Sequence, residues 1–302
     1  MAKKILITGG TGLIGTQLTK LLTQKGYTVA ILTRNPEEHN GDALAYKWDI
    51  AKGYIDPDAF KNTNYIIHLA GAGVADKRWT PSRKEEIINS RVRSAQLLYN
   101  WLAENEHTVE GFISSSGVSY YKQNTGERLL EDADAGSDFL AEVTKVWEKG
   151  AEKIKSIGIR TVIFRIGVVL SNKGGALVEL ARPVRLGAAA PLGTGKQIMS
   201  WVHINDLCRM FVFAIENPKL EGVFNAVAPH PVSNKDFTVE IAKTLNKFAF
   251  LPAVPSFALK MVLGERAAMV LDGANVSSEK LETHDFVFEF PKLPAALRNL
   301  LV

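Results

Sequence analysis

The stretch that decides the fold lies near the amino terminus, where residues 4–15 read KILITGGTGLIG. Lys4–Thr8 form a short apolar run of the kind that makes a buried strand. A glycine-rich turn follows, and it opens the helical pattern of Leu13–Lys25, which Gly26 ends. A strand, a Gly-x-Gly-x-x-Gly turn and a helix in this order predict a dinucleotide-binding unit.

The glycines of this turn have separate expected roles. Gly9 or Gly10 permits the tight turn, Gly12 lets the backbone approach a pyrophosphate, and Gly15 lets the helix pack closely. The free N–H groups and the positive dipole end of the helix favour phosphate. A glycine-rich turn that binds nothing is the alternative. The residues expected against the cofactor here are Gly9, Thr11, Gly12, Leu13, Ile14 and Gly15.

Short apolar runs and longer helical patterns alternate along most of the chain. This alternation predicts parallel βαβ units and an α/β fold, a Rossmann-type doubly wound parallel sheet. The expected strands are Lys4–Thr8, Thr28–Thr33, Leu44–Trp48, Tyr65–Leu69, Gly111–Ser114 and Arg160–Arg165. The expected helices are Leu13–Lys25, Pro81–Asn105, Ser137–Ser156 and His203–Glu216. The helix Pro81–Asn105 should turn inward Ile87, Ile88, Val92, Ala95, Leu98 and Leu102.

The pattern changes after the sixth strand, where glycines and prolines become frequent. We expect a Rossmann domain over residues 1–170, to which residues 198–226 return. A smaller α+β substrate lobe should comprise residues 171–197 and 227–302.

Composition bounds the class of protein. The 302 residues are 46% hydrophobic and 23% charged, an ordinary globular mix. The net charge of +4 is too weak to indicate a nucleic-acid partner, although it suits an anionic ligand. Cys208 is the single cysteine, which excludes an internal disulfide and fits a reducing cytoplasm. We expect no membrane segment, and the scattered histidines predict no metal site.

The end of the second expected strand favours NADP(H) over NAD(H). An NAD enzyme usually places a carboxylate there to bind the ribose, but this chain has Arg34 and no carboxylate until Glu37. An arginine can hold a 2′-phosphate, and a solvated surface charge is the alternative. Asp49, after the third strand, is expected to meet the adenine or to cap a turn. The small residues expected along the ribose are Leu69, Ala70, Gly71 and Ala72.

Several stretches together resemble a known family. The glycine turn and the serines at 114–116 are similar to extended short-chain dehydrogenases/reductases. The segments 69–72, 77–80, 90–94, 193–203 and 255–302 narrow the resemblance to an atypical "epimerase family" subgroup with its own C-terminal domain of unknown function, which here would be the last stretch of about 50 residues. Members are often labelled NAD-dependent epimerase, nucleoside-diphosphate-sugar epimerase or cell-division inhibitor. We further expect cofactor contacts from Ser114, Ile166, Gly167 and Val168.

The resemblance also implies a catalytic serine, tyrosine and lysine, the last two spaced as Tyr-x-x-x-Lys on one helix face. Ser116 matches the serine by position. The helix at 138–148 contains no tyrosine: Leu140 and Thr144 stand at the matching positions. Tyr120, just after the fifth strand, is a candidate replacement, and aromatic packing of its loop is the alternative.

A basic and aromatic group of residues is expected on the substrate side of the crevice. Such a crevice suits a small anionic substrate, either a nucleotide-sugar or a phosphorylated or carboxylated carbonyl compound. The candidates are Arg78, Trp79, Arg91, Lys196, Gln197, Ser200 and His203. His68, by contrast, is expected to be a hydrogen-bonded core histidine.

Two functions remain open at this point. One is an NADP(H)-dependent oxidoreductase or epimerase with an altered proton donor. The other is a catalytically weak or inactive NADP(H)-binding protein that acts as a sensor or regulator. The protein is expected to be a monomer or a homodimer.

Overall fold

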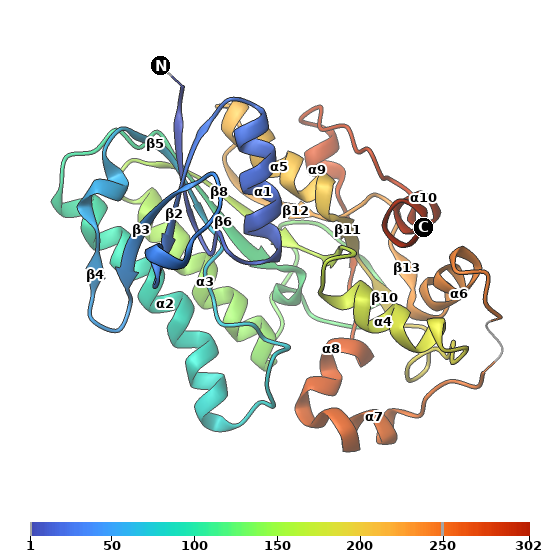
Figure 1. Ribbon diagram of the computed structural model, residues 1–302. Coiled ribbons are helices and arrows are strands. Elements are labelled where there is room, and N and C mark those ends of the chain that lie inside the picture. The colour runs from blue at the N-terminus through green and yellow to red at the C-terminus, as the bar shows by residue number, and fades with distance from the viewer. Residues whose placement is uncertain (1, 249–250) are drawn as a thin grey trace.

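A computed structural model describes residues 2–248 and 251–302. Its centre is an eight-stranded sheet in the order β12-β8-β6-β5-β1-β2-β3-β4 (Figure 1). Neighbouring strands are parallel, except that β4 pairs antiparallel with β3. The strands are β1 (Lys4–Thr8), β2 (Thr28–Thr33), β3 (Leu44–Asp49), β4 (Tyr54–Ile55), β5 (Thr63–His68), β6 (Gly111–Gly117), β8 (Arg160–Ile166) and β12 (Gly222–Ala226). The strand order reverses between β1 and β5, which is where such sheets bind ligands.

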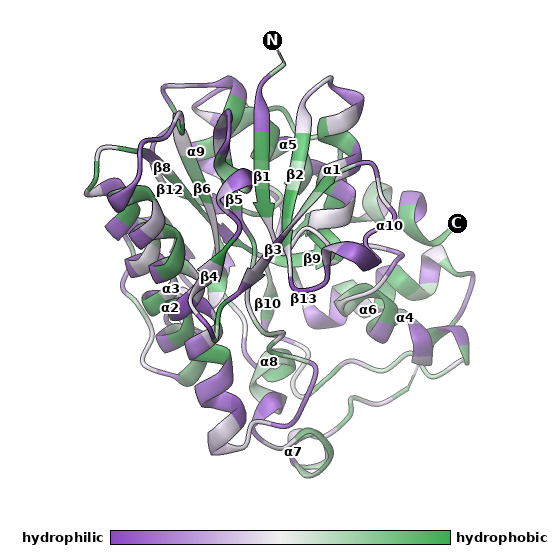
Figure 2. Cartoon of the chain, turned by 60° about the vertical axis from the view of Figure 1, so that its left-hand side comes forward, coloured by the Kyte–Doolittle hydropathy of each residue, from purple (hydrophilic) through white to green (hydrophobic). Residues whose placement is uncertain are grey.

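Helices cover both faces of the sheet (Figure 1). One face carries α1 (Leu13–Gln24) and α5 (Ile204–Glu216), and the other carries α2 (Pro81–Glu104) and α3 (Phe139–Lys155). Figure 2 shows hydrophobic colouring along the central strands β1 and β2, which are buried between these helix layers. The predicted α/β Rossmann class is confirmed, and each predicted strand and helix is present with its ends displaced by at most three residues.

The inner face of α2 needs one correction. Val92, predicted to point inward, is 41% exposed, whereas Arg91 is buried. With 3.6 residues per turn, the stripe that starts at Ile87 continues four residues on at Arg91, and Val92 lies further round the helix. The predicted stripe contained Val92 and did not contain Arg91.

The remaining elements form a smaller α+β part beside the sheet. Its short strands pair in three small sheets: β9 (Val168–Leu170) with β11 (Trp201–His203), β10 (Ile198–Met199) with β13 (Val232–Ser233), and β7 (Arg128–Leu129) with β14 (Asn275–Val276). Its helices are α4 (Ala176–Arg185), α6 (Asn234–Thr244), α7 (Ser256–Leu263), α8 (Ala268–Leu271), α9 (Glu279–Glu282) and α10 (Leu293–Leu301). The described residues also include the 3₁₀ turns η1 (Pro36–Glu38), η2 (Pro57–Phe60), η3 (Val118–Tyr120) and η4 (Gly264–Ala267).

The C-terminal segment shares the main hydrophobic core. Phe286, Leu293 and Leu297 are buried in the same cluster as Phe211 of α5 and Phe237 of α6. The last helices are therefore part of one continuous interior.

Within residues 2–248 and 251–302, no helix has both the length and the apolar character needed to cross a membrane. No group of three metal-ligating side chains occurs in this part of the chain either.

Candidate functional site

The glycine turn after β1 has the geometry that its sequence predicts. Gly9 has φ +69°, a left-handed conformation that favours glycine. A Cβ on Gly15 would lie 2.3 Å from the Gly9 carbonyl oxygen, so only glycine allows α1 to approach the turn this closely. The N-cap residue of α1 is Gly12; it provides no side-chain cap, and the first turn contains no acidic residue. The start of α1 therefore leaves its backbone N–H groups and dipole available to an anion.

Thr8 joins the ends of β1 and β5 at the switch point of the sheet. Its hydroxyl oxygen accepts hydrogen bonds from the backbone N–H groups of Leu69 and Ala70, both at 3.2 Å. The same hydroxyl lies 2.8 Å from Nδ1 of His68, whose Nε2 lies 3.3 Å from the Ser94 hydroxyl. Thr8 thus holds the segment expected along the cofactor ribose against the glycine turn.

Two core residues match their predictions. Burial lowers the pKa of His68 to about 3, and the charge of Arg91 contributes further, so this hydrogen-bonded core histidine is neutral. Cys208 is buried, and burial raises the pKa of its thiol to about 12.

The ends of β2 and β3 lie side by side and carry the residues expected near the adenosine. Arg34 is exposed directly after β2. One carboxylate oxygen of Asp49 accepts from the backbone N–H groups of Ala51 at 3.0 Å and Lys52 at 3.2 Å. Asp49 thus caps a turn, which is the alternative role weighed for it.

A pocket of about 220 Å³ lies beyond the carboxyl ends of β6 and β8. Leu140 and Thr144, the residues at the tyrosine and lysine positions, are both in its wall. The hydroxyl of Thr144 donates within its own helix, to the carbonyl oxygens of Leu140 at 3.2 Å and Ala141 at 2.9 Å. The full lining is Val74, Arg91, Gly117, Val118, Ser119, Leu140, Val143, Thr144, Trp147, Ile166, Gly167, Val168 and Met269.

Arg91 is the one predicted substrate residue that lines this pocket. Its Nη1 donates to the carbonyl oxygens of Ala72 at 3.1 Å and Ile87 at 3.0 Å. Gly71 makes room for it, since a Cβ there would lie 2.9 Å from the guanidinium carbon. The expected cofactor residues Ile166, Gly167 and Val168 border the same pocket.

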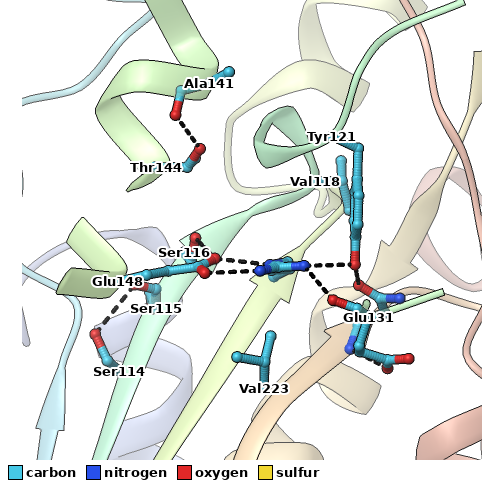
Figure 3. A network of polar contacts seen from close by, with 12 residues as sticks. Ser114, Ser115, Ser116, Val118, Tyr121, Glu131, Ala141, Thr144, Glu148 and Val223 are labelled. Carbon is cyan, nitrogen blue, oxygen red and sulfur yellow. Dashed lines mark hydrogen bonds and ion pairs between the residues drawn. The ribbon is translucent and has the colours of Figure 1, made fainter. Parts of the chain in front are cut away.

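A buried polar network lies next to the pocket (Figure 3). The Ser116 hydroxyl donates to Oε1 of Glu148 at 2.7 Å, and Arg165 donates to both oxygens of Glu148 at 2.8 Å. Arg165 also donates to the Tyr121 hydroxyl at 3.0 Å, which donates to Oδ1 of Asn225 at 2.6 Å. Burial disfavours the Arg165 cation, but the hydrogen bonds and charge of Glu148 outweigh that cost and hold its pKa above the usual value.

The two residues predicted to be catalytic belong to this network and do not line the pocket. Ser116 is 4% exposed, and its proton is engaged by Glu148. The ring of Tyr120 packs on Arg165, with 3.4 Å between the guanidinium carbon and the ring centroid, and edge-on against Tyr121. Ser114 is also fully buried, and it donates to the Ser115 carbonyl at 3.2 Å. No sequence pattern indicated Glu148 as the partner of Ser116.

The other predicted substrate residues are spread through the fold, and four of them have hydrogen-bond partners within the protein. His203 caps α5 through Nδ1, contacts Asn299 through Nε2 at 3.1 Å and stacks on Phe290. Its burial, at 1% exposed, places it in the core beneath α10. Ser200 is also buried: its hydroxyl donates to the Ala274 carbonyl at 2.7 Å.

Gln197 and Trp79 are likewise engaged by the fold. Gln197 donates to the carbonyl oxygens of Leu192 and Val270. Trp79 packs between α2 and α3, and its indole N–H donates to the Val74 carbonyl at 2.8 Å. Lys196 remains an exposed charge.

Side-chain contacts join α7 and η4 to α2 and to the loop between β5 and α2. Arg266 donates to the Ala75 carbonyl at 2.7 Å, and Arg78 donates to the Val262 carbonyl at 3.3 Å. Lys84 forms an ion pair with Glu265. Through these contacts α8 brings Met269 into the wall of the pocket. The predicted substrate residue Arg78 therefore joins two parts of the protein.

A doubly wound sheet with an open glycine turn at its switch point defines a Rossmann-type nucleotide-binding protein. Residues 5–226 match the NAD dependent epimerase/dehydratase family, and residues 254–300 match a domain of unknown function, DUF1731. The chain belongs to the NAD dependent epimerase/dehydratase family. The resemblance to extended short-chain dehydrogenases/reductases with an additional C-terminal domain is thereby confirmed.

Relatives of similar length carry the family name. The chain is 35% identical to an epimerase family protein of Staphylococcus haemolyticus, with 99% of each chain covered. Its structure resembles that of the human epimerase family protein SDR39U1 with NADPH, at 31% identity, a TM-score of 0.87 and 98% of each chain covered. A nucleoside-diphosphate sugar epimerase from Corynebacterium glutamicum is 30% identical with a TM-score of 0.79; the match covers 100% of this chain and 58% of that one.

Proposed function

We propose that this protein is an NADP(H)-dependent oxidoreductase of the extended short-chain dehydrogenase/reductase type that acts on a small anionic carbonyl compound. The observation that carries the proposal is the uncapped start of α1 beside an arginine at the end of β2. The relative that was crystallised with NADPH supports the choice of cofactor.

The residues present fit such a cofactor. The backbone at Gly12–Gly15 would hold the pyrophosphate, because Gly12 has no side chain to keep the phosphates away and the helix start carries no acidic group. Arg34 would hold the 2′-phosphate. The segments 69–72 and 166–168 would border the two riboses and the nicotinamide. When bound, the cofactor supplies a hydride donor or acceptor.

The proton donor is the part that departs from the usual chemistry. Leu140 cannot move a proton, and the Thr144 hydroxyl is committed to backbone carbonyls. This observation favours the second candidate, an NADP(H)-binding sensor or regulator with little or no turnover. The pocket with its single arginine favours the enzyme.

Cofactor binding is tested by titrating the protein with NADPH and NADH and following nucleotide fluorescence. Arg34→Asp should weaken NADPH binding at least about tenfold, because it replaces a charge-assisted contact by a repulsive one. NADH affinity is the internal control and should change little. NADPH affinity that stays the same in Arg34→Asp would contradict the assignment.

Turnover separates the two candidates. NADPH oxidation is followed against a panel of carbonyl acids and nucleotide-sugars. Oxidation with any one of them supports the enzyme. Tight NADPH binding without oxidation across the panel, and with no change in Ser116→Ala or Tyr120→Phe, supports the sensor.

A further inference from the structure

Two buried N–H donors without an acceptor lie together in the pocket wall. Nε of Arg91 and Nε1 of Trp147 are both inaccessible to solvent, and neither has a hydrogen-bond partner in the part of the chain that the structure describes. The guanidinium carbon of Arg91 lies 4.4 Å from the Trp147 ring centroid, and both side chains line the pocket. A buried donor without an acceptor is unfavourable, so a ligand oxygen that reaches these two groups after a small side-chain movement would supply hydrogen bonds that the protein itself does not.

The charge of Arg91 is also uncompensated. Only 6% of the residue is exposed, and its hydrogen bonds go to neutral carbonyl oxygens. No ion pair joins it to a carboxylate in residues 2–248 or 251–302. Burial, and then the charge of Arg83, lowers its pKa to about 10, which still leaves it a cation at neutral pH. An unpaired buried cation favours an anionic ligand over a neutral one.

The rest of the pocket selects for a ligand of low polarity. Apart from Arg91, no ionisable side chain of the described residues lines it. The walls that face this single charge are mostly aliphatic: Val74, Val118, Leu140, Val143, Ile166, Val168 and Met269.

Four cations of the adjoining loop, α2 and η4 have partners within the protein. Lys84 is paired with Glu265, and Arg83 with Glu86. Arg78 and Arg266 donate to backbone carbonyls across the join with α7 and η4. Among residues 2–248 and 251–302, Arg91 is the one cation in the pocket lining, so a ligand in the pocket meets one positive charge and not the two that a nucleoside diphosphate would favour.

We infer that the pocket binds a small, mainly apolar carboxylate, whose oxygens accept hydrogen bonds from Arg91 and Trp147. The inference rests on the proposed function and names its substrate class. It separates this chain from a nucleotide-sugar enzyme, because a diphosphate needs more than one positive group.

The test uses isothermal titration of the NADPH-loaded protein with three probes. Hexanoate should bind. Hexanamide, which is of equal length but neutral, should bind at least about tenfold more weakly, since it lacks the charge that Arg91 requires. Uridine diphosphate should bind more weakly than hexanoate.

Variants of Arg91 and Trp147 test whether these residues cause the preference for hexanoate over hexanamide. Arg91→Met should abolish the preference for hexanoate over hexanamide. Trp147→Phe keeps the aromatic ring but removes the N–H, and should weaken hexanoate binding several-fold. Arg93→Met is the matched control: this exposed arginine lies two residues away on the same helix, and its loss should change nothing. Circular dichroism melts identify any variant that fails to fold, and Trp147→Phe then carries the test.

Three results would overturn the inference: equal binding of hexanoate and hexanamide, tighter binding of uridine diphosphate, or loss of NADPH affinity instead of hexanoate affinity in Arg91→Met. The last would assign the guanidinium to the cofactor. An absence of NADPH binding by the unaltered protein would instead refute the proposed function itself, and the inference with it.

Discussion

At the scale of single residues, the role of a side chain is set by partners that lie far away in the sequence. Ser116 stands where a catalytic serine is expected, but its proton is held by Glu148 in α3, and Arg165 in β8 holds Glu148 in turn. A buried, hydrogen-bonded ion pair cannot lose one member cheaply. The network therefore stabilises the structure next to the pocket, and the role of Ser116 is to take part in this network.

The free energy of unfolding should depend on pH because of His68. Its folded pKa is about 3, against an ordinary value of 6.5, so between these values the unfolded chain binds the extra proton. The stabilisation is fully present above pH 6.5 and is lost as the pH falls toward 3. From pH 7 to pH 5 this residue alone should lower the free energy of unfolding by about 2 kcal/mol.

Urea unfolding at both pH values measures the effect. His68→Gln should lose less stability on acidification than the unaltered protein, whatever its stability at pH 7. His107→Gln, at a half-exposed loop histidine, serves as the comparison. Parallel pH profiles for His68→Gln and the unaltered protein would show that His68 is not the neutral core group described.

Residues in the glycine turn were predictable because their roles are local. The spacing of Gly9, Gly12 and Gly15 predicts a tight turn and a close approach of α1 to that turn, and both depend only on residues nearby in the sequence. Arg91 was predicted as a substrate residue from its place in a basic cluster, and that role stays a prediction. Its burial depends on Gly71 and Trp147, which only the fold brings to it.

At the scale of elements, α1 depends on how closely it approaches the turn before it. In Gly15→Ala the new Cβ would lie 2.3 Å from the Gly9 carbonyl oxygen and 2.6 Å from the Gly10 Cα. This steric clash can be relieved only if the start of α1 moves away from the turn. We expect a loss of about 1–3 kcal/mol in the free energy of unfolding and at least about tenfold weaker NADPH binding.

Urea unfolding and NADPH fluorescence measure the two effects. Lys20→Ala, on the exposed side of the same helix, controls for helix propensity and should leave both unchanged. If Gly15→Ala retained full NADPH affinity, the close approach of α1 to the turn would be irrelevant to the cofactor.

The long elements were predictable and the short strands were not. β1, β2 and β8 are mostly buried runs with a neighbouring strand on each side, so their composition agrees with their place in the sheet. The two-residue strands β7 and β14 pair although almost 150 residues separate them, and neither has a pattern of its own. Such strands form because the surrounding packing brings their backbones together.

At the scale of the whole molecule, a match to a separate family domain does not make residues 254–300 a separate folding unit. Leu293, Leu297 and Leu300 of α10 are buried in the main cluster, which also contains Trp201 and Phe211. In addition, β14 pairs with β7, and Ser200 bonds to Ala274 and Val276. The segment completes the core of the protein and one wall of its pocket.

Removal of residues 254–302 tests this arrangement. Truncation would expose the apolar faces of α5 and α6 that α10 covers, and would leave the Ser200 hydroxyl without its partners. Each large buried side chain lost costs about 2–5 kcal/mol, and a protein is stable by only about 5–15 kcal/mol. The truncated chain should therefore be insoluble or lack a cooperative thermal transition and NADPH binding. As a control, Leu300→Ala, a single buried residue of α10, should lower the melting temperature but retain cooperativity. A truncated chain that melted cooperatively at the temperature of the full chain would show that residues 1–253 hold a complete core of their own.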